Sequence, residues 1–313
     1  MSEKSKVICI VGPTASGKTS LSVELAKKLN GEIICADSMQ IYEGITVASA
    51  APSEEEKCGI PHHLFEFLEK GSEFCVADYV NLAREKISEI ISRGKQPIVV
   101  GGTGLYINAL ADNILYTEQK YDSGIRGELE KECEQKGSEY MLEKLKKIDS
   151  LAAQDLHPNN TRRILRAIEI YYTTGLTKTE QNELSKRQEN PYGYIMLGVN
   201  YSSREALYER INMRVEKMLE NGLLEEAKRT YENKSLNKSK GALQAIGHKE
   251  FFEFFEGNIT YDEAVENLKR STRRYAKRQL TWFNRDNRIN WIYPDITPDV
   301  FGEALKIIKE ERQ

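Results

Sequence analysis

Residues Gly12–Thr19 read GPTASGKT and follow directly on the apolar run Val7–Val11. They match G-x-x-x-x-G-K-[ST], a phosphate-binding loop in which backbone N–H groups surround phosphate oxygens. Apolar residues from Leu21 to Leu29 then recur at helical spacing, so a buried strand, the loop and a helix are expected in that order. Because the loop amides and the positive end of the helix would converge on one point, this context predicts a diphosphate site.

Each residue of the loop is a candidate ligand contact. Lys18 is expected to reach the outer phosphate as a point charge, and the Thr19 hydroxyl is expected to bind a magnesium ion that bridges phosphate oxygens. Mg²⁺ is therefore the expected cofactor. The candidate diphosphate- or nucleotide-binding residues are Gly12, Pro13, Thr14, Ala15, Ser16, Gly17, Lys18 and Thr19.

Length and composition limit the setting. The chain has 313 residues, of which 40% are hydrophobic, enough for one large or two ordinary globular domains. A formal net charge of -3 means that any nucleic-acid contact must come from a local basic patch. Five cysteines without C-x-x-C spacing suit a reducing compartment, and no apolar run approaches the roughly 18 residues of a membrane span. We expect a cytoplasmic protein with no membrane partner.

Short apolar runs alternate with helical patterns along the chain. This alternation predicts an α/β fold of the P-loop NTPase type, a parallel sheet with helices on both faces and ligands at the carboxyl ends of its strands. The stretch between the third and fourth runs is too long for a simple crossover and shows only helical pattern. We therefore expect an inserted all-helical domain at residues 116–190 and a catalytic core at residues 1–115 and 191–313. The predicted strands are Val7–Val11, Glu32–Ala36, Pro97–Val100, Tyr194–Val199 and Ile289–Tyr293.

Two polar segments follow predicted strands. Asp37 opens DSMQIY, and its carboxylate could complete a magnesium shell, act as a general base or cap the next segment. The segment GGTGLY, Gly101–Tyr106, contains Thr103, which could cap a helix or contact a ligand. The residues alone leave these alternatives open.

Arginines are concentrated on two predicted helices. The pattern from Arg204 to Tyr231 predicts one long helix, with Arg210 and Arg214 four residues apart on one face. The last predicted helix, Lys269–Arg288, has eight Lys or Arg against one Asp. On it Arg270, Arg274 and Arg278 share a face that would attract phosphates, although a solvated charged surface is the simpler alternative.

Six motifs occur in a defined order: GPTASGKT, DSMQIY, GIPHHL at 59–64, GGTGLY, HPNNTRRILRAIE at 157–169 and QAIGHKE at 244–250. With them the chain resembles the tRNA dimethylallyltransferases, also called tRNA isopentenyltransferases, over essentially its whole length. His248 stands where that family's motif would have tyrosine. The resemblance implies transfer of a dimethylallyl group from dimethylallyl diphosphate to the exocyclic amine of the adenosine 3′ of a tRNA anticodon. Diphosphate would be released, with magnesium required.

The resemblance also implies roles for residues. Asp37 would be the base, Thr103 its partner, and Lys18 and Arg214 would stabilise the departing diphosphate. We expect a monomer, because a tRNA anticodon stem-loop must reach both the sheet and the insertion. The implied tRNA-binding residues are Asp37, Ser38, Met39, Gln40, Thr103, Arg126, Arg162, Arg163, Ile164, Leu165 and Arg166, and the basic face adds Arg270, Arg274 and Arg278.

Three other functions are compatible with parts of the sequence. A phosphate loop alone also suits an ATP-dependent small-molecule kinase. An adenylate isopentenyltransferase would use the same prenyl donor on free AMP, ADP or ATP, but it would need neither the insertion nor the arginine stripe. A non-catalytic RNA-binding protein with a nucleotide switch would leave the Asp37 and Thr103 motifs unexplained.

Overall fold

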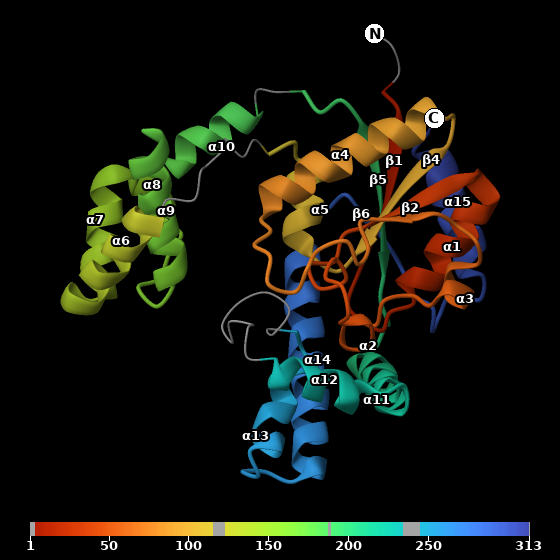
Figure 1. Cartoon of the computed structure of the whole chain (residues 1–313). Coiled ribbons are helices and arrows are strands. Elements are labelled where there is room, and N and C mark those ends of the chain that lie inside the picture. The colour runs from red at the N-terminus through yellow and green to blue at the C-terminus, as the bar shows by residue number, and fades with distance from the viewer. Residues whose placement is uncertain (1–3, 115–122, 187–188, 234–244, 313) are drawn as a thin grey trace. The chain divides into compact units, whose positions relative to one another are not determined.

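The structure, a computed structural model, describes residues 4–114, 123–186, 189–233 and 245–312 (Figure 1). The chain divides into two compact units. The first combines Met1–Ile107 with Pro191–Gln313, and the second comprises Asn108–Asn190. The division falls within helix α5, Gly104–Ala111.

A parallel sheet forms the centre of the first unit. In the described part of the chain it has six strands in the order β3-β2-β4-β1-β5-β6. The predicted parallel α/β sheet is confirmed, and five strands agree with the apolar runs to within one residue at each end. The edge strand β3 was not predicted, because two histidines show no apolar alternation. The strands are β1 Lys6–Val11, β2 Gly31–Cys35, β3 His62–His63, β4 Gln96–Gly101, β5 Gly193–Val199 and β6 Ile289–Ile292.

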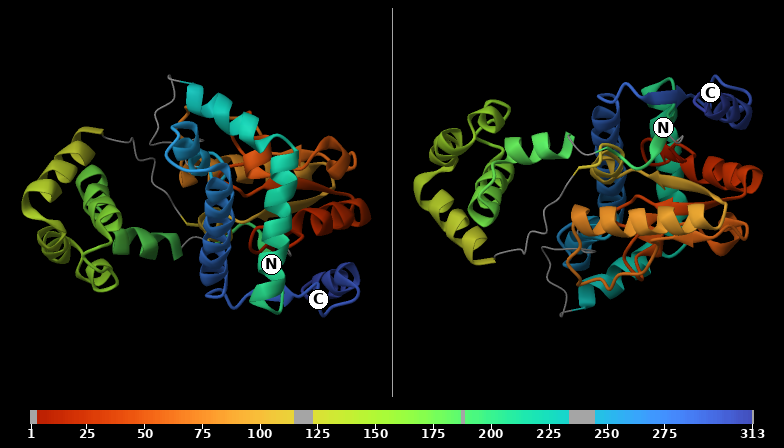
Figure 2. Two further views of the ribbon diagram at one scale, coloured as in Figure 1. Left: turned by 90° about the horizontal axis from the view of Figure 1, so that it is seen from below. Right: turned by 90° about the horizontal axis from the view of Figure 1, so that it is seen from above.

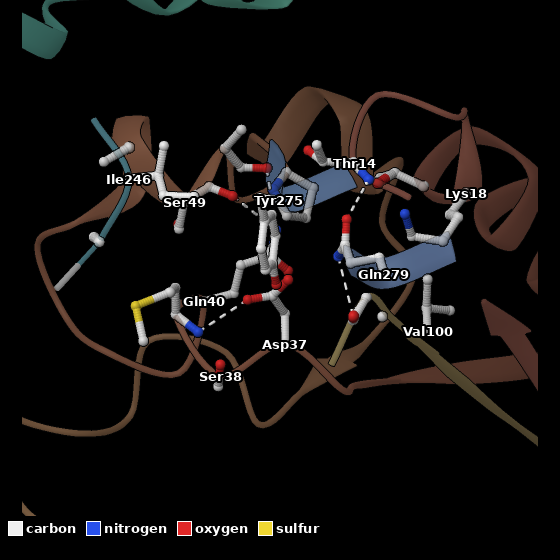
Figure 3. A pocket seen from close by; sticks show the side chains of 18 of the residues that line it. Thr14, Lys18, Asp37, Ser38, Gln40, Ser49, Val100, Ile246, Tyr275 and Gln279 are labelled. Atoms are coloured by element: carbon white, nitrogen blue, oxygen red, sulfur yellow. Dashed lines mark hydrogen bonds between the residues drawn. The ribbon is translucent and has the colours of Figure 1, made fainter. Parts of the chain in front are cut away.

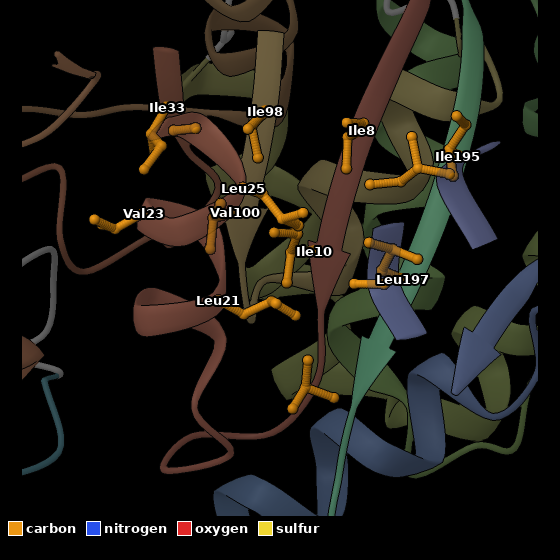
Figure 4. Close-up of a cluster of buried hydrophobic side chains, with 14 of the residues drawn as sticks. Ile8, Ile10, Leu21, Val23, Leu25, Ile33, Ile98, Val100, Ile195 and Leu197 are labelled. Carbon is orange, nitrogen blue, oxygen red and sulfur yellow. The ribbon is translucent and has the colours of Figure 1, made fainter. Parts of the chain in front are cut away.

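Helices cover both faces of this sheet (Figures 1 and 2). Helices α1 (Lys18–Leu29) and α15 (Val300–Glu310) pack on one face, and α4 (Val76–Ser92) lies on the other. Alternate strand residues such as Ile8 and Ile10 join the buried side chains of α1 in one cluster (Figure 4). Burying both faces explains why the strands read as nearly continuous apolar runs.

Strands β1, β2 and β4 end at the same level of the sheet. Val11 at the end of β1 lies opposite Gly101 of β4. Just beyond β2, the Ala36 N–H donates to the Val100 carbonyl at 2.7 Å, and the Ala36 carbonyl accepts from the Thr103 N–H at 3.1 Å. The loops that follow these three strands therefore emerge side by side at the carboxyl edge.

Further helices of the first unit pack together in a cluster of their own. The prediction of one long helix from Arg204 to Tyr231 was wrong. The chain forms two helices there, separated at Gly222, which has φ 88°. A glycine takes this left-handed conformation readily and ends the helical pattern. The helices of this cluster are α2 Thr46–Ser49, α11 Arg204–Glu220, α12 Leu223–Glu232, a 3₁₀ turn Lys249–Phe251, α13 Phe252–Phe255 and α14 Tyr261–Phe283, and the short α3, Glu54–Lys57, lies outside it.

Helix α14 differs from its prediction at both ends. It starts eight residues before Lys269, where Thr260 and Glu263 form a reciprocal capping box, and it ends at Phe283 rather than Arg288. It is also not the last helix, since α15 follows β6. None of the helices within the described ranges is both long and apolar enough to cross a membrane.

The second unit contains only helices in its described residues. Its core includes Leu129, Met141, Leu145, Ile164 and Ile168. Asp149 ties α8 to α10, because its carboxylate accepts from the Ala152 N–H and from both the N–H and the hydroxyl of Thr179. The helices are α6 Ser123–Lys136, α7 Ser138–Ile148, α8 Ser150–Gln154, α9 Thr161–Thr174 and α10 Lys178–Lys186.

Candidate active site

A cavity of about 270 Å³ lies in the first unit, where the carboxyl-edge loops meet α11 and α14 (Figure 3). Thr14, Lys18 and Thr19 of the phosphate loop line it, together with Asp37. The other loop residues do not line it. Ser16 is fully buried, and its hydroxyl has no hydrogen-bond partner among the described residues.

The phosphate loop turns into α1 through Gly17, which has φ 99° and caps the helix. The Lys18 ammonium donates to the Pro13 carbonyl at 2.6 Å, so the lysine folds back over its own loop. This contact holds the charge near the loop amides, where phosphate oxygens are expected to bind.

Positive charge dominates the cavity. Within the described residues its cationic lining consists of Lys18, Arg214, Lys249 and Arg278, against the single carboxylate of Asp37. Burial and, to a smaller extent, the Arg214 charge lower the pKa of Lys18 to about 7, and the Asp37 carboxylate partly opposes this change. Burial likewise lowers the pKa of Arg214. Such a site favours a multiply charged anion, which would relieve the repulsion between the cations.

Binding of inorganic pyrophosphate is expected to take up about one proton at pH 8 and much less at pH 6. With a pKa of about 7, Lys18 is largely neutral at pH 8, and a nearby anion restores its protonated form. Calorimetry in buffers of different ionisation enthalpy measures this uptake. Lys18→Arg is the control, because its guanidinium stays charged and any proton uptake that it shows comes from pyrophosphate itself. Equal uptake by the two proteins would contradict the prediction.

Asp37 closes a local turn and also faces the cavity. Its Oδ1 accepts from the Met39 N–H at 2.9 Å and closes a local turn, while the side chain also lines the cavity. Thr103 does not itself line the cavity. Its Oγ1 accepts from the Ser38 N–H at 2.9 Å and thereby joins the GGTG loop to the Asp37 loop.

Glu226, which was missed from the sequence, and His248, which was noted there only as a departure from a motif, are both buried and support the wall of the cavity. The Glu226 carboxylate accepts from the N–H groups of Val47 and Ala48 and from His248 Nε2, each at 2.9 Å. Burial alone would raise the pKa of Glu226, but these hydrogen bonds outweigh it and lower the pKa. His248 therefore has a specific partner in Glu226. Glu226 in turn holds α2, whose last residue, Ser49, lines the cavity.

Helix α14 provides side chains that sequence reasoning missed. Thr272, Tyr275 and Gln279 line the cavity at intervals of three and four residues. Burial raises the pKa of Tyr275, Asp37 raises it further, and hydrogen bonds with Thr103 and Gln279 oppose the rise. The helical spacing of Leu268, Thr272 and Gln279 in a strongly basic segment was the available signal for this buried face.

The arginines of α14 have different surroundings. Arg270, Arg274 and Arg278 are all exposed, but only Arg278 of the three lines the cavity. Arg270 donates to Asn267, one turn earlier on the same helix. On α11, Arg214 lines the cavity, whereas Arg210 lies over the ring of Tyr201, 5.7 Å from its centre.

The second unit holds the other predicted tRNA contacts. Arg162, Arg163 and Arg166 are exposed on α9. Glu169 is almost fully buried, and its carboxylate pairs with Arg166 at 3.0 Å and with Arg126 at 3.5 Å, which orients both guanidinium groups.

Two of the predicted contacts in this unit need correction. The side chains of Ile164 and Leu165 are 0% and 3% exposed and belong to the helical core, so they cannot contact RNA directly. Their inclusion followed motif adjacency, which does not distinguish the two faces of a helix.

Magnesium would depend on oxygen ligands here. The described residues contain no group of three or more His, Cys, Asp or Glu side chains able to hold a metal. Thr19 is exposed and lines the same cavity as Asp37, which places a hydroxyl and a carboxylate beside the phosphate loop. This set fits Mg²⁺, which usually takes few protein ligands and completes its shell with water and substrate phosphates.

The fold and the cavity together define a class, the P-loop α/β enzymes that hold a phosphorylated ligand beside a carboxylate. The profile of the IPP transferase family matches residues 40–286, and that of the isopentenyl transferases matches residues 5–72. A tRNA dimethylallyltransferase of Bacillus subtilis is 46% identical over 303 residues, covering 97% of this chain and 95% of the relative. The chain belongs to the tRNA dimethylallyltransferase family of prenyl transferases, as its motifs predicted.

Solved structures agree with this assignment. The tRNA isopentenylpyrophosphate transferase of Bacillus halodurans is 41% identical, with a TM-score of 0.73 over 99% of this chain and 97% of that chain. A eukaryotic dimethylallyltransferase acting on tRNA is 31% identical, with a TM-score of 0.82 over 97% of this chain and 78% of that chain. The likeness therefore extends over both units.

Proposed function

We propose that this chain transfers the dimethylallyl group of dimethylallyl diphosphate to the exocyclic amine of the adenosine immediately 3′ of a tRNA anticodon. One observation carries the proposal: the cationic phosphate loop and the Asp37 carboxylate line one small cavity. A diphosphate leaving group and a nucleophile that must lose a proton need these two features side by side. Membership of the family supports the same reaction.

On the acceptor side, the adenine amine is a weak nucleophile because its lone pair is delocalised into the ring. Asp37 takes the amine proton as the new C–N bond forms, which requires a separation of roughly 2.6 to 3.2 Å in the complex. Two hydrogen bonds hold the loop that carries this carboxylate, one from the Met39 N–H to Asp37 and one from the Ser38 N–H to the Thr103 hydroxyl. Preorganisation of the base is therefore built into the backbone.

On the donor side, the bond between the allylic carbon and the bridging oxygen breaks, and negative charge grows on the diphosphate. Lys18, Arg214 and the loop N–H groups stabilise that charge, an interaction that strengthens toward the transition state. When bound at Thr19, Mg²⁺ would neutralise part of the phosphate charge. The C–O bond breaks and the bonds to phosphorus remain intact.

The remaining wall of the cavity suits a short prenyl chain. Apolar side chains of Ile33, Phe65, Val100 and Met218 line it together with the charged groups. Such a wall excludes water from an allylic carbon that develops positive charge. The cavity thus combines an anion site with an apolar compartment.

The tRNA is expected to bind through basic surface on each unit. Pulling the adenosine from its stack costs a few kcal/mol, which contacts with the RNA must offset. Arg270, Arg274 and Arg278 on α14 and the arginines of α9 are exposed and available for phosphates. We further propose that the enzyme works as a monomer in the cytoplasm, where its RNA substrate resides.

Arg274→Ala is expected to weaken tRNA binding severalfold and to reduce the slope of log affinity against log salt by about one, because one phosphate contact is lost. Arg274 is exposed in the middle of the basic face of α14. Filter binding over a salt series measures both quantities. Lys28→Ala, an equally exposed cation on α1, should change neither, and an unchanged slope for Arg274→Ala would remove this face from the interface.

The rival functions have less support. The isopentenyl transferase profile ends at residue 72, whereas the IPP transferase profile reaches residue 286 and so covers the second unit, α11 and α14. A transferase acting on free nucleotides has no need of these basic surfaces. A kinase would need a binding site for a phosphoryl acceptor beside the phosphate loop, and the apolar lining found there does not suit one.

One assay tests the function against its rivals. The protein is incubated with dimethylallyl diphosphate labelled in the prenyl group, Mg²⁺ and either unmodified tRNA, AMP or ATP. The proposal expects label in tRNA alone, with equimolar release of diphosphate. Label in AMP or ATP, or release of phosphate from ATP without label transfer, would overturn it.

A further inference from the structure

Gln279 connects two loops of the active site through one buried side chain. Its Oε1 accepts from the Thr14 N–H at 2.9 Å, and its Nε2 donates to the Gly102 carbonyl at 3.0 Å (Figure 3). The residue is 5% exposed and comes from α14, far along the chain from both loops. Thr14 belongs to the phosphate loop, and Gly102 precedes Thr103.

These contacts require an amide. A primary amide donates from its nitrogen and accepts at its oxygen, whereas an ionised carboxylate of the same size only accepts. The fit is also close, since a Cβ at Gly102 would lie 2.1 Å from Gln279 Nε2. The second glycine of GGTG therefore makes room for this amide, a role that the turn alone does not require.

The two loops serve opposite halves of the proposed reaction. The phosphate loop holds the leaving group, whereas the Thr103 hydroxyl accepts a hydrogen bond from the Ser38 N–H in the loop that carries Asp37. Displacement of reacting groups by about 1 Å can cost roughly 100-fold in rate. A rigid bridge between the loops would therefore control the rate more than the affinity for either substrate.

We propose that Gln279 is a positioning residue that sets the separation between the diphosphate site and the loop of the catalytic base. The inference rests on the proposed prenyl transfer. It gives α14 a positioning role besides the expected RNA contacts of its exposed arginines, because the buried face of the same helix bonds to both loops of the site.

Gln279→Leu and Gln279→Glu test the proposal at saturating tRNA and prenyl diphosphate. At pH 8 both variants should lose about 100-fold in kcat, because the leucine makes neither hydrogen bond and a carboxylate cannot donate to Gly102. Binding of tRNA should change less than twofold. Thermal unfolding of each variant checks that it is folded at the assay temperature.

The pH profile separates positioning from packing. A protonated carboxyl group both donates and accepts, so the kcat of Gln279→Glu relative to wild type should rise as the pH falls from 8 to 5.5, while that of Gln279→Leu stays flat. Gln96→Glu is the control, because the Gln96 amide also donates to a backbone carbonyl, that of Lys6, but lies at the opposite edge of the sheet. Its ratio to wild type should stay near one at every pH.

Either of two results would overturn the proposal: wild-type kcat in both variants, or an equal loss in both with no dependence of the ratio on pH. The wild-type enzyme is measured in the same series. If it modifies no tRNA, the proposed function fails, and that failure is distinct from the failure of the positioning role.

Discussion

Replacing Asp37 with asparagine should lower kcat for tRNA prenylation by about 10²- to 10⁴-fold, the usual contribution of a general base. The substitution is nearly isosteric, and its amide oxygen can still accept from the Met39 N–H that Asp37 Oδ1 binds at 2.9 Å. The turn therefore persists while the basic group is lost. Single-turnover rates with both substrates saturating measure the effect on the chemical step.

The affinity for tRNA should change less than twofold in Asp37→Asn, because one neutral group replaces one carboxylate within a large interface. Asp295→Asn is the matched control, since the Asp295 carboxylate also accepts from a backbone N–H, that of Ser202 at 3.0 Å, away from the cavity. It should retain the wild-type rate. A rate for Asp37→Asn within tenfold of wild type would rule out Asp37 as the base.

The parts of the site that lie next to strands were predictable from the sequence. A phosphate loop must begin where β1 ends, and parallel strands place their carboxyl ends at one edge, so Lys18, Asp37 and the GGTG segment were expected together. The register confirms this for the backbone, with Val11 opposite Gly101. Local pattern was sufficient because the sheet itself brings these segments together.

The residues contributed by distant helices were not predictable in the same way. Gln279 acts on Thr14 and Gly102, which lie 265 and 177 positions away, and no local pattern records such a pairing. Glu226 was missed for the same reason, since its partners Val47 and Ala48 lie 179 and 178 positions earlier in the chain. Single-sequence reasoning finds amphipathic faces but cannot tell which element each face will meet.

Other errors had a signal that went unused. Ile164 and Leu165, with Ile168, follow the apolar period of α9, and that period marks the buried face, whereas Arg162 and Arg166 fall outside it. Gly222 similarly marked the break between α11 and α12. Helical periodicity was thus the better guide to contact surfaces than proximity to a motif.

The second large effect is expected at Arg214, whose guanidinium lies in the cavity with Lys18 and Asp37. Arg214→Gln should lower kcat by about 10²- to 10³-fold, the loss typical for one group that stabilises developing negative charge. Arg210→Gln provides a matched control one turn earlier on α11, because Arg210 lies over Tyr201 rather than in the cavity. It should stay within twofold of wild type.

Arg214→Gln should also change the titration of Lys18, which connects the electrostatics of the site to its chemistry. The Arg214 charge helps to lower the pKa of Lys18 to about 7, so its removal should raise that pKa and leave more Lys18 protonated at pH 8. Pyrophosphate binding to Arg214→Gln should then take up less than the roughly one proton expected of wild type. A large loss of rate with unchanged proton uptake would show that Arg214 acts without the charge coupling to Lys18.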